Sequence, residues 1–204
     1  MMKNSKELKE KAWETLKNDN YWNLFLVNLL IILIVGVSNF LSIFLIGTLL
    51  VSQALMNLNV YRKKEFQFEN MLEPFKKNFV NTLTTYLLKM VFIFLWSLLF
   101  VIPGIIKTFS YAMTDYILVD NPDLTANEAI KESQKMMNGN KLRLFILHLS
   151  FIGWYLLSIL TLGIGLVFLI PYIKAAETAF YLDLVNENNI IINEEIEEVE
   201  IIIE

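Results

Sequence analysis

The residues of this sequence that are best suited to chemistry are ionisable side chains within long uncharged stretches. They are Lys89, Lys107, Asp115, His148, Lys174 and Glu177. A charged side chain at the centre of a membrane helix costs roughly 2.5–3.5 kcal/mol, so such residues persist mainly where they have a function or a partner. Each is therefore a candidate for ligand binding, for proton transfer or for a structural ion pair.

The spacing places most of these side chains on two helical faces. Lys107, Tyr111 and Asp115 are four residues apart, and Lys174 and Glu177 are three apart. Residues three and four apart share one face of a helix. Two such faces turned toward each other would form a polar seam, which can bind a small ligand or carry protons.

A structural interpretation competes with the polar seam. Lys174 and Glu177 can pair on one helix, and Lys89 can reach an acid across the bundle. Lysines near the ends of spans can also extend their ammonium groups to the headgroups. The candidate seam of Lys89, Lys107, Tyr111, Asp115, Lys174 and Glu177 is therefore either a site or a set of ion pairs.

The sequence offers few residues for enzyme chemistry. It has no cysteine, which excludes thiolate nucleophiles and Cys-ligated metals, and His148 is its single histidine. It contains no phosphate-binding glycine loop and no Gly-x-Ser-x-Gly nucleophile motif. We expect no enzymatic activity, no cofactor and no metal site.

Composition points to lipid as the medium around most of the chain. Hydrophobic residues make up 55% of the 204 residues, only 19% are charged, and the mean hydropathy is +0.49. A soluble domain carries about a quarter charged residues. Because backbone groups in lipid must be satisfied within the span, helices are expected.

Three uncharged or nearly uncharged blocks, 22–60, 79–119 and 143–183, each have about twice the ~20 residues that one crossing needs. Each block therefore predicts a helical hairpin. Pro103 and Gly104 mark the second turn, and Gly163 and Gly165 the third, because proline removes a donor and glycine allows positive φ. The predicted fold is an all-α membrane protein, whose six transmembrane helices form one domain over residues 22–185.

A short amphipathic stretch precedes each hairpin, within residues 1–21, 66–78 and 125–138. The third begins with Thr125 and Glu128 at the spacing of a capping box and ends near Gly139, a typical C-cap. We interpret these stretches as helices in the headgroup plane; solvated connectors are the alternative.

Lysine and arginine counts orient the predicted hairpins. Residues 1–21 carry five, 61–78 carry five and 120–143 carry four, whereas the three turns carry none. By the positive-inside rule both termini of this protein of the cell membrane are predicted to be cytoplasmic.

The expected partners are the bilayer, with anionic lipids of its inner leaflet, and a second copy or another membrane protein. Nucleic acid is not expected, since the bases alternate with acids beside the spans.

The end of the chain differs in composition. Residues 186–204 contain seven glutamates and no base, and without them the formal net charge of −4 becomes +3. Isoleucine triplets at 190–192 and 201–203 can pair as strands. The uncompensated carboxylates favour disorder instead, which is our prediction.

Several runs resemble one known family. They are IPGIIK at 102–107, SYAM at 110–113, YILVDNP at 116–122, LSFIGW at 149–154, LTLGIG at 160–165 and IPY at 170–172. In these runs, and over about residues 5–185, the chain is similar to the DUF975 family of bacterial and archaeal membrane proteins. The resemblance implies a multi-pass membrane protein without an assigned molecular function. The chain departs from the family's usual pattern at Asp115, His148 and Lys174.

Two functions stay open on the sequence. The first is a noncatalytic membrane protein that acts through lipid or protein contacts, as an accessory, stress or immunity component. The second is a small transporter or channel that uses the intramembrane charges. Pro171 gives the second some support, because a proline inside a helix frees a carbonyl that a solute can use.

Overall fold

A computed structural model describes residues 4–17, 20–37, 42–64, 66–99, 101–161 and 163–203. At residues 20, 34–37, 42–44, 99, 101 and 188–203 it describes the backbone alone. Every regular element in these ranges is a helix. The prediction of an all-α protein is thereby confirmed for the described residues.

The first two predicted hairpins correspond to contacting helix pairs. α2 (Asn20–Val37) packs on α3 (Ser42–Tyr61), and α5 (Phe79–Leu99) packs on α6 (Val101–Ser110). Mostly apolar sequence forms these helices, with Lys89 in α5 and Lys107 in α6 as their charged residues, and many of their large apolar side chains face outward.

The second hairpin differs from the sequence expectation in two respects. Pro103 and Gly104 lie in the first turn of α6, where a missing N–H is tolerated. Gly104 allows α6 to approach α5 closely, because a Cβ added at Gly104 would collide with Ser97 of α5. The returning segment is also two helices, α6 and α7 (Thr114–Asp120), separated at residues 111–113.

The region predicted as the third hairpin contains α9 (Lys141–Leu149) and α10 (Ile152–Leu160), which pack on α11 (Ile164–Ile203). Gly163 lies between α10 and α11 with φ of 85°, a conformation that favours glycine. Gly165 is already the second residue of α11.

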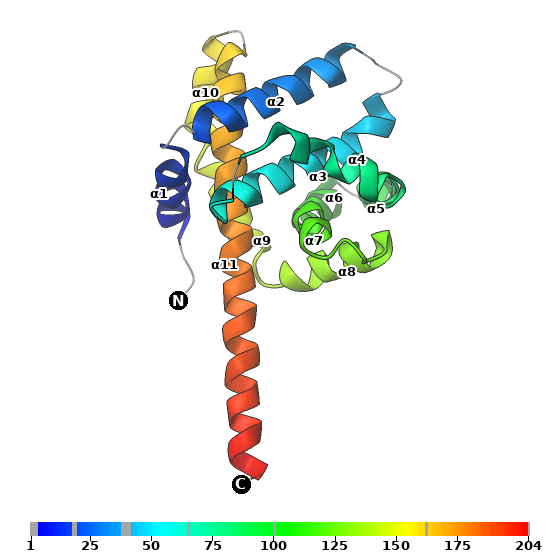
Figure 1. Cartoon of the computed structure of the whole chain (residues 1–204), viewed down its shortest axis with the longest axis vertical. Coiled ribbons are helices and arrows are strands. Elements are labelled where there is room, and N and C mark those ends of the chain that lie inside the picture. Colours follow the sequence, from blue (N-terminus) through cyan, green and yellow to red (C-terminus); the bar gives the residue numbers. More distant parts are fainter. Residues whose placement is uncertain are drawn as a thin grey trace.

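The tail is helical in the structure, in contrast to the predicted disorder. α11 continues without interruption through residues 186–203. Extending an existing helix adds one hydrogen bond per residue without a new nucleation step, and glutamate is a good helix former. Figure 1 shows this C-terminal part of α11 extending beyond the other helices.

The amphipathic segments lie close to the hairpins. α1 (Ser5–Leu16) begins at an Asn4–Glu7 capping box and buries Leu8, Ala12 and Leu16. It packs on α11 near the middle of the third hairpin, with Lys9 Nζ donating to the Ser150 carbonyl at 3.2 Å. The apolar side of α1 thus has a protein partner in α11, and its position in the headgroup plane stays a prediction.

The other two segments form shorter helices. Residues 66–78 are divided between the 3₁₀ helix η1 (Phe68–Leu72) and α4 (Glu73–Lys77), because Pro74 starts a new helix within the segment. α8 (Ala126–Met136) begins with both hydrogen bonds of the Thr125–Glu128 capping box, which confirms that motif. Gly139 follows it with φ of 79°.

Three described segments are long and apolar enough to cross a membrane by length and composition: Phe79–Leu98, Lys141–Leu160 and Ile164–Glu187. Tyr21–Leu33 and Leu45–Tyr61 are shorter apolar helices. In Figure 1, α2 and α3 cross α11 instead of running alongside it. The hairpins therefore do not share one axis.

Apolar side chains cover much of the outside. Exposed fractions reach 80% at Leu160, 74% at Val80 and 67% at Leu98. A monomeric soluble protein rarely exposes contiguous apolar surface of this kind. The buried core is formed mainly by α1, α3, α7, α9 and α11, with Phe180 of α11 fully enclosed.

Candidate functional site

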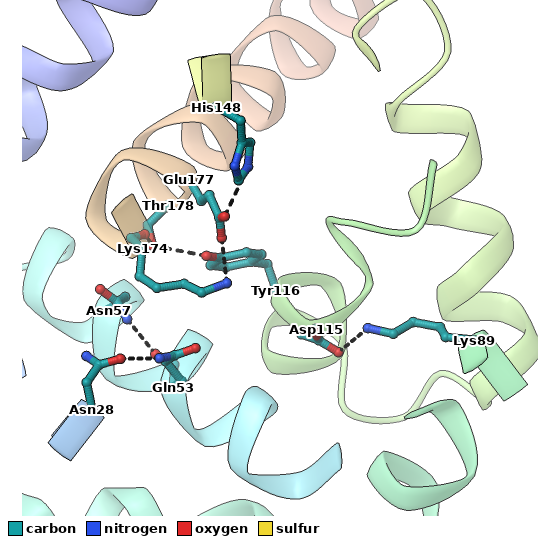
Figure 2. Close-up of polar contacts among 10 residues, drawn as sticks. All are labelled: Asn28, Gln53, Asn57, Lys89, Asp115, Tyr116, His148, Lys174, Glu177 and Thr178. Atoms are coloured by element: carbon teal, nitrogen blue, oxygen red, sulfur yellow. Dashed lines mark hydrogen bonds and ion pairs between the residues drawn. The ribbon is translucent and has the colours of Figure 1, made fainter. Parts of the chain in front are cut away.

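The centre of the polar network is the carboxylate of Glu177 on α11 (Figure 2). Lys174, one turn earlier, donates from Nζ to Glu177 Oε2 at 2.8 Å. His148 on α9 approaches Glu177 Oε1 with Nε2 at 3.2 Å. The Glu177 side chain is only 13% exposed, so both partners compensate a largely buried charge. The local Lys174–Glu177 pairing follows the predicted spacing, whereas His148 joins it through the packing of α9 on α11.

An aromatic contact links this triad to α7. The Tyr116 hydroxyl lies 3.4 Å from Thr178 Oγ1, and the Tyr116 ring stacks on Tyr181 with centroids 5.2 Å apart. Tyr116 and Thr178 are both buried. α7 and α11 therefore meet through tyrosines.

Lys89 pairs with Asp115 and not with Glu177. Its Nζ lies 2.7 Å from Asp115 Oδ1, and the two side chains are 11% and 20% exposed. Figure 2 shows this pair apart from the Glu177 triad, with Tyr116 between them. The pair joins α5 to the first turn of α7.

Lys107 belongs to neither group. Its ammonium lies 4.7 Å from the centroid of the Trp96 ring and 5.8 Å from that of Tyr111. Because the helix is interrupted at residues 111–113, Lys107 and Asp115 do not continue on one face. The six candidate residues thus fall into three separate groups: Lys174 with Glu177, Lys89 with Asp115, and Lys107 with Tyr111.

Three ion pairs near the helix ends, centred on Arg62 and Arg143, were not predicted from the sequence. Asp120 accepts from Arg62 Nη2 at 2.7 Å and from the Tyr181 hydroxyl at 2.8 Å. The hydrogen bond to Asp120 raises the pKa of the Arg62 guanidinium. Arg143 contacts Asp183 at 2.9 Å and Glu187 at 3.3 Å. These partners are 40 or more residues apart, so only the tertiary fold brings them together.

A neutral polar cluster inside the first hairpin was also missed. Gln53 Nε2 donates to Asn28 Oδ1, and Asn57 Nδ2 donates to the Gln53 carbonyl at 2.8 Å (Figure 2). Asn57 Oδ1 is buried without a hydrogen-bond partner in the described structure. The i, i+4 spacing of two amides within an apolar span was the available signal.

The chemistry open to these groups is limited. Within the described ranges, no group of three or more His, Asp or Glu side chains is placed to hold a metal ion. The deep ionisable side chains Lys89, Asp115, His148, Lys174 and Glu177 each contact another of the group. The Lys89–Asp115 and His148–Glu177 contacts join different helices, whereas the Lys174–Glu177 pair lies within α11.

Comparison with known proteins gives one finding. Residues 98–188 match the family described as "Protein of unknown function (DUF975)", which confirms the resemblance seen in the sequence runs. The match covers α6 to the middle of α11 and includes Asp115, His148, Lys174 and Glu177, while Lys89 lies before it. No curated protein and no solved structure matches the chain.

Proposed function

We propose that this DUF975-related chain is a multi-pass integral membrane protein that acts without catalysis, through contacts with lipid or with partner proteins. The observation that carries the proposal is the apolar outer surface. Large hydrophobic side chains are exposed along α2, α5, α9 and α10. Lipid tails are the medium in which such a surface is stable.

The proposed topology has six spans as three hairpins, with both ends and the connections at 61–78 and 120–143 in the cytoplasm. The basic residues in those connections support it. The crossing of α2 and α3 over α11 then requires the hairpins to tilt within the bilayer, which transmembrane helices commonly do.

The absence of cysteine makes this topology directly testable. Single cysteines are introduced by Asn127→Cys, in the 120–143 connection, and by Thr161→Cys, beside the α10–α11 turn; both positions are exposed. A membrane-impermeant maleimide is expected to label Thr161→Cys in intact cells, and Asn127→Cys only after permeabilisation. Labelling of Asn127→Cys in intact cells would contradict the six-span arrangement.

The pairing of the deep charges favours a role through lipid or protein contacts over transport. A solute path needs a polar group that is free to exchange partners, whereas Lys89 and Lys174 each face a carboxylate at 2.7–2.8 Å. Ion pairs that join helices in lipid stabilise the bundle. Vesicles reconstituted with the protein are therefore expected to show no proton flux above that of empty vesicles.

Transport is the second candidate, and the Glu177 triad is the observation that favours it. A histidine and a carboxylate meet at 3.2 Å within the third hairpin, and Pro171 lies inside α11 two turns before Glu177. If the triad carries protons, reconstituted protein gives a flux that Glu177→Gln abolishes. A flux that Glu177→Gln leaves unchanged would remove the triad from the mechanism.

A further inference from the structure

A groove of about 710 Å³ lies between the end of α4, the first turns of α5 and the start of α8. We call it the α4–α5–α8 groove. Asn78 Nδ2 donates to the Pro122 carbonyl at 3.2 Å, and Asn81 Nδ2 to the Leu124 carbonyl at 2.7 Å. These two hydrogen bonds fix the segment before α8 against the start of α5. The volume of the groove lies within the range of small-molecule sites, which is ~300–1,000 Å³.

One end of the groove carries positive charge without an acid in the lining. Lys76 and Lys77, in the last turn of α4, line this end and are both exposed. Lys77 pairs with Glu73, which lies outside the lining, whereas Lys76 has no ion-pair partner in the described part of the chain. The carboxylate of Glu128, in the first turn of α8, accepts from the N–H and the hydroxyl of Thr125. This end of the groove therefore favours an anionic group.

The other end of the groove is an apolar face of α5. Val80, Thr84 and Leu88 line it at intervals of four residues, so they share one side of the helix. The Thr84 hydroxyl donates to the Val80 carbonyl at 2.7 Å, so it has no hydrogen left for a ligand. Val80 is 74% exposed, and the exposed side chains of Leu87 and Met90 continue the apolar surface along α5. This end of the groove therefore favours hydrocarbon.

The two ends lie where the two parts of a membrane lipid lie. Phe79–Leu98 is long and apolar enough to cross a membrane, and Lys76 and Lys77 come directly before it. In the proposed topology the connection that contains both lysines is cytoplasmic, so their charges meet the headgroups of the inner leaflet. From Val80 to Leu88 the groove follows α5 for ~12 Å at 1.5 Å per residue, and one leaflet supplies half of the ~30 Å hydrocarbon core. The groove thus extends through most of one leaflet.

We infer that the α4–α5–α8 groove binds one anionic phospholipid of the inner leaflet. Its phosphate lies at Lys76 and Lys77, and an acyl chain lies along the face of α5 that begins at Val80. The charge of the lining selects an anionic headgroup. The continuity of the groove with the outward apolar surface of α5 selects a lipid over a soluble anion. This inference rests on the proposed membrane location.

Tryptophan fluorescence tests the inference with two reporters on α5. All four native tryptophans are first replaced by phenylalanine. Leu87→Trp then places an indole beside the groove, and Phe94→Trp places one about two turns further along α5. Both positions are exposed, and neither lines the groove. Each reporter is reconstituted in phosphatidylcholine bilayers that contain an equal minor fraction of brominated phosphatidylglycerol or brominated phosphatidylcholine.

Bromine quenches nearby indoles, so quenching measures which lipid lies at each reporter. At Leu87→Trp the anionic lipid is expected to be preferred about fivefold, equivalent to ~1 kcal/mol at 1.4 kcal/mol per tenfold. Replacing both groove lysines, by Lys76→Gln and Lys77→Gln, is expected to remove the preference. At Phe94→Trp the two lipids are expected to quench equally.

A second double variant is the matched control. Lys63→Gln with Lys64→Gln removes two exposed charges from the same connection, outside the groove lining. It is expected to leave the preference at Leu87→Trp in place. An equal loss in the two double variants means that the whole connection attracts anionic lipid, and overturns the site. A preference that survives the loss of both Lys76 and Lys77 overturns it as well.

The remaining outcomes separate the site from the membrane location on which it rests. Equal quenching of Leu87→Trp by the two lipids overturns the anionic site. Protection of Leu87→Trp from both lipids, with normal quenching of Phe94→Trp, means that protein covers this face and also overturns it. Loss of quenching at both reporters overturns the membrane location itself. Native mass spectrometry of the unmodified chain, from detergent micelles with equal phosphatidylglycerol and phosphatidylcholine, gives a second readout, in which equal retention of the two lipids counts against the site.

Discussion

Lys89 of α5 and Asp115 of α7 are joined at 2.7 Å across 26 residues of sequence. Their contact fixes the first turn of α7 directly after the interruption at residues 111–113. The returning segment of the second hairpin is thus anchored by charge where its helical hydrogen bonding is broken. We therefore expect Lys89 and Asp115 to contribute jointly, and not independently, to the free energy of unfolding.

Removing one partner of this pair leaves the other charge largely buried. Lys89→Met and Asp115→Leu are each expected to lower the free energy of unfolding by about 3 kcal/mol. The double variant is expected to recover most of that loss, since no unpaired charge remains. Unfolding by denaturant in detergent micelles measures the cycle. Losses that simply add in the double variant would show that the two residues are not coupled.

Glu177 is expected to be the most sensitive residue of its triad, because Glu177→Gln deprives both Lys174 and His148 of their acceptor charge. We expect Glu177→Gln to destabilise the protein by about 3 kcal/mol and His148→Gln by less. The matched control is Glu132→Gln, which breaks the exposed pair with Lys135 on α8 and is expected to cost less than ~0.5 kcal/mol. A larger effect at Glu132 than at Glu177 would contradict the structural role of the triad.

The start of α8 is expected to depend on pH. Hydrogen bonds from Thr125 hold the pKa of the Glu128 carboxyl below its usual value. A lowered folded-state pKa contributes stability above the unfolded-state pKa, and this contribution is lost as the pH falls through the folded-state value. Amide exchange in the first turn of α8 should therefore accelerate on acidification.

Two variants check the origin of that dependence. Glu128→Gln is expected to abolish the pH dependence of exchange in α8. Thr125→Ala is expected to weaken it, since the Thr125 backbone N–H still donates to Glu128, and to remove ~1 kcal/mol of helix stability. Exchange that accelerates equally with acid in Glu128→Gln would assign the effect to another group.

Two glycines allow the effect of backbone conformation on stability to be measured without a steric clash from an added side chain. An added Cβ meets no atom within 4 Å at either Gly139 or Gly153. Because Gly139 has φ of 79°, Gly139→Ala is expected to cost ~1–2 kcal/mol. Gly153→Ala, within α10, is expected to be neutral or to stabilise by up to ~1 kcal/mol. Thermal unfolding in detergent compares them, and equal midpoints would contradict the positive φ at Gly139.

Local patterns in the sequence predicted the features that depend on neighbouring residues. The Thr125–Glu128 capping box and the Lys174–Glu177 pair are each three residues apart, so one helical turn determines them. Pro103 was more ambiguous, because proline both ends helices and begins them. In the structure it lies at the beginning of one.

No comparable sequence pattern indicates the contacts that depend on how the helices pack against one another. The Arg62–Asp120 pair and the approach of His148 to Glu177 join different helices, and an apolar pattern does not indicate which helices meet. The interruption falls on Tyr111, Ala112 and Met113, none of which is a glycine or a proline, so no helix-breaking residue marks it. Spacing of four residues therefore overestimated how far the face through Lys107 and Asp115 extends.

The contact between α1 and the third hairpin has a consequence for biosynthesis. Lys9 and Tyr172 are joined across 163 residues, so α1 leaves the ribosome long before its partner does. At about 5–20 residues per second, that interval is roughly 10–30 s. During it, Leu8, Ala12 and Leu16 need a temporary cover, and the nearby bilayer surface provides one. Formation of α9, α10 and α11 then becomes the event that draws the first helix of the nascent chain into place.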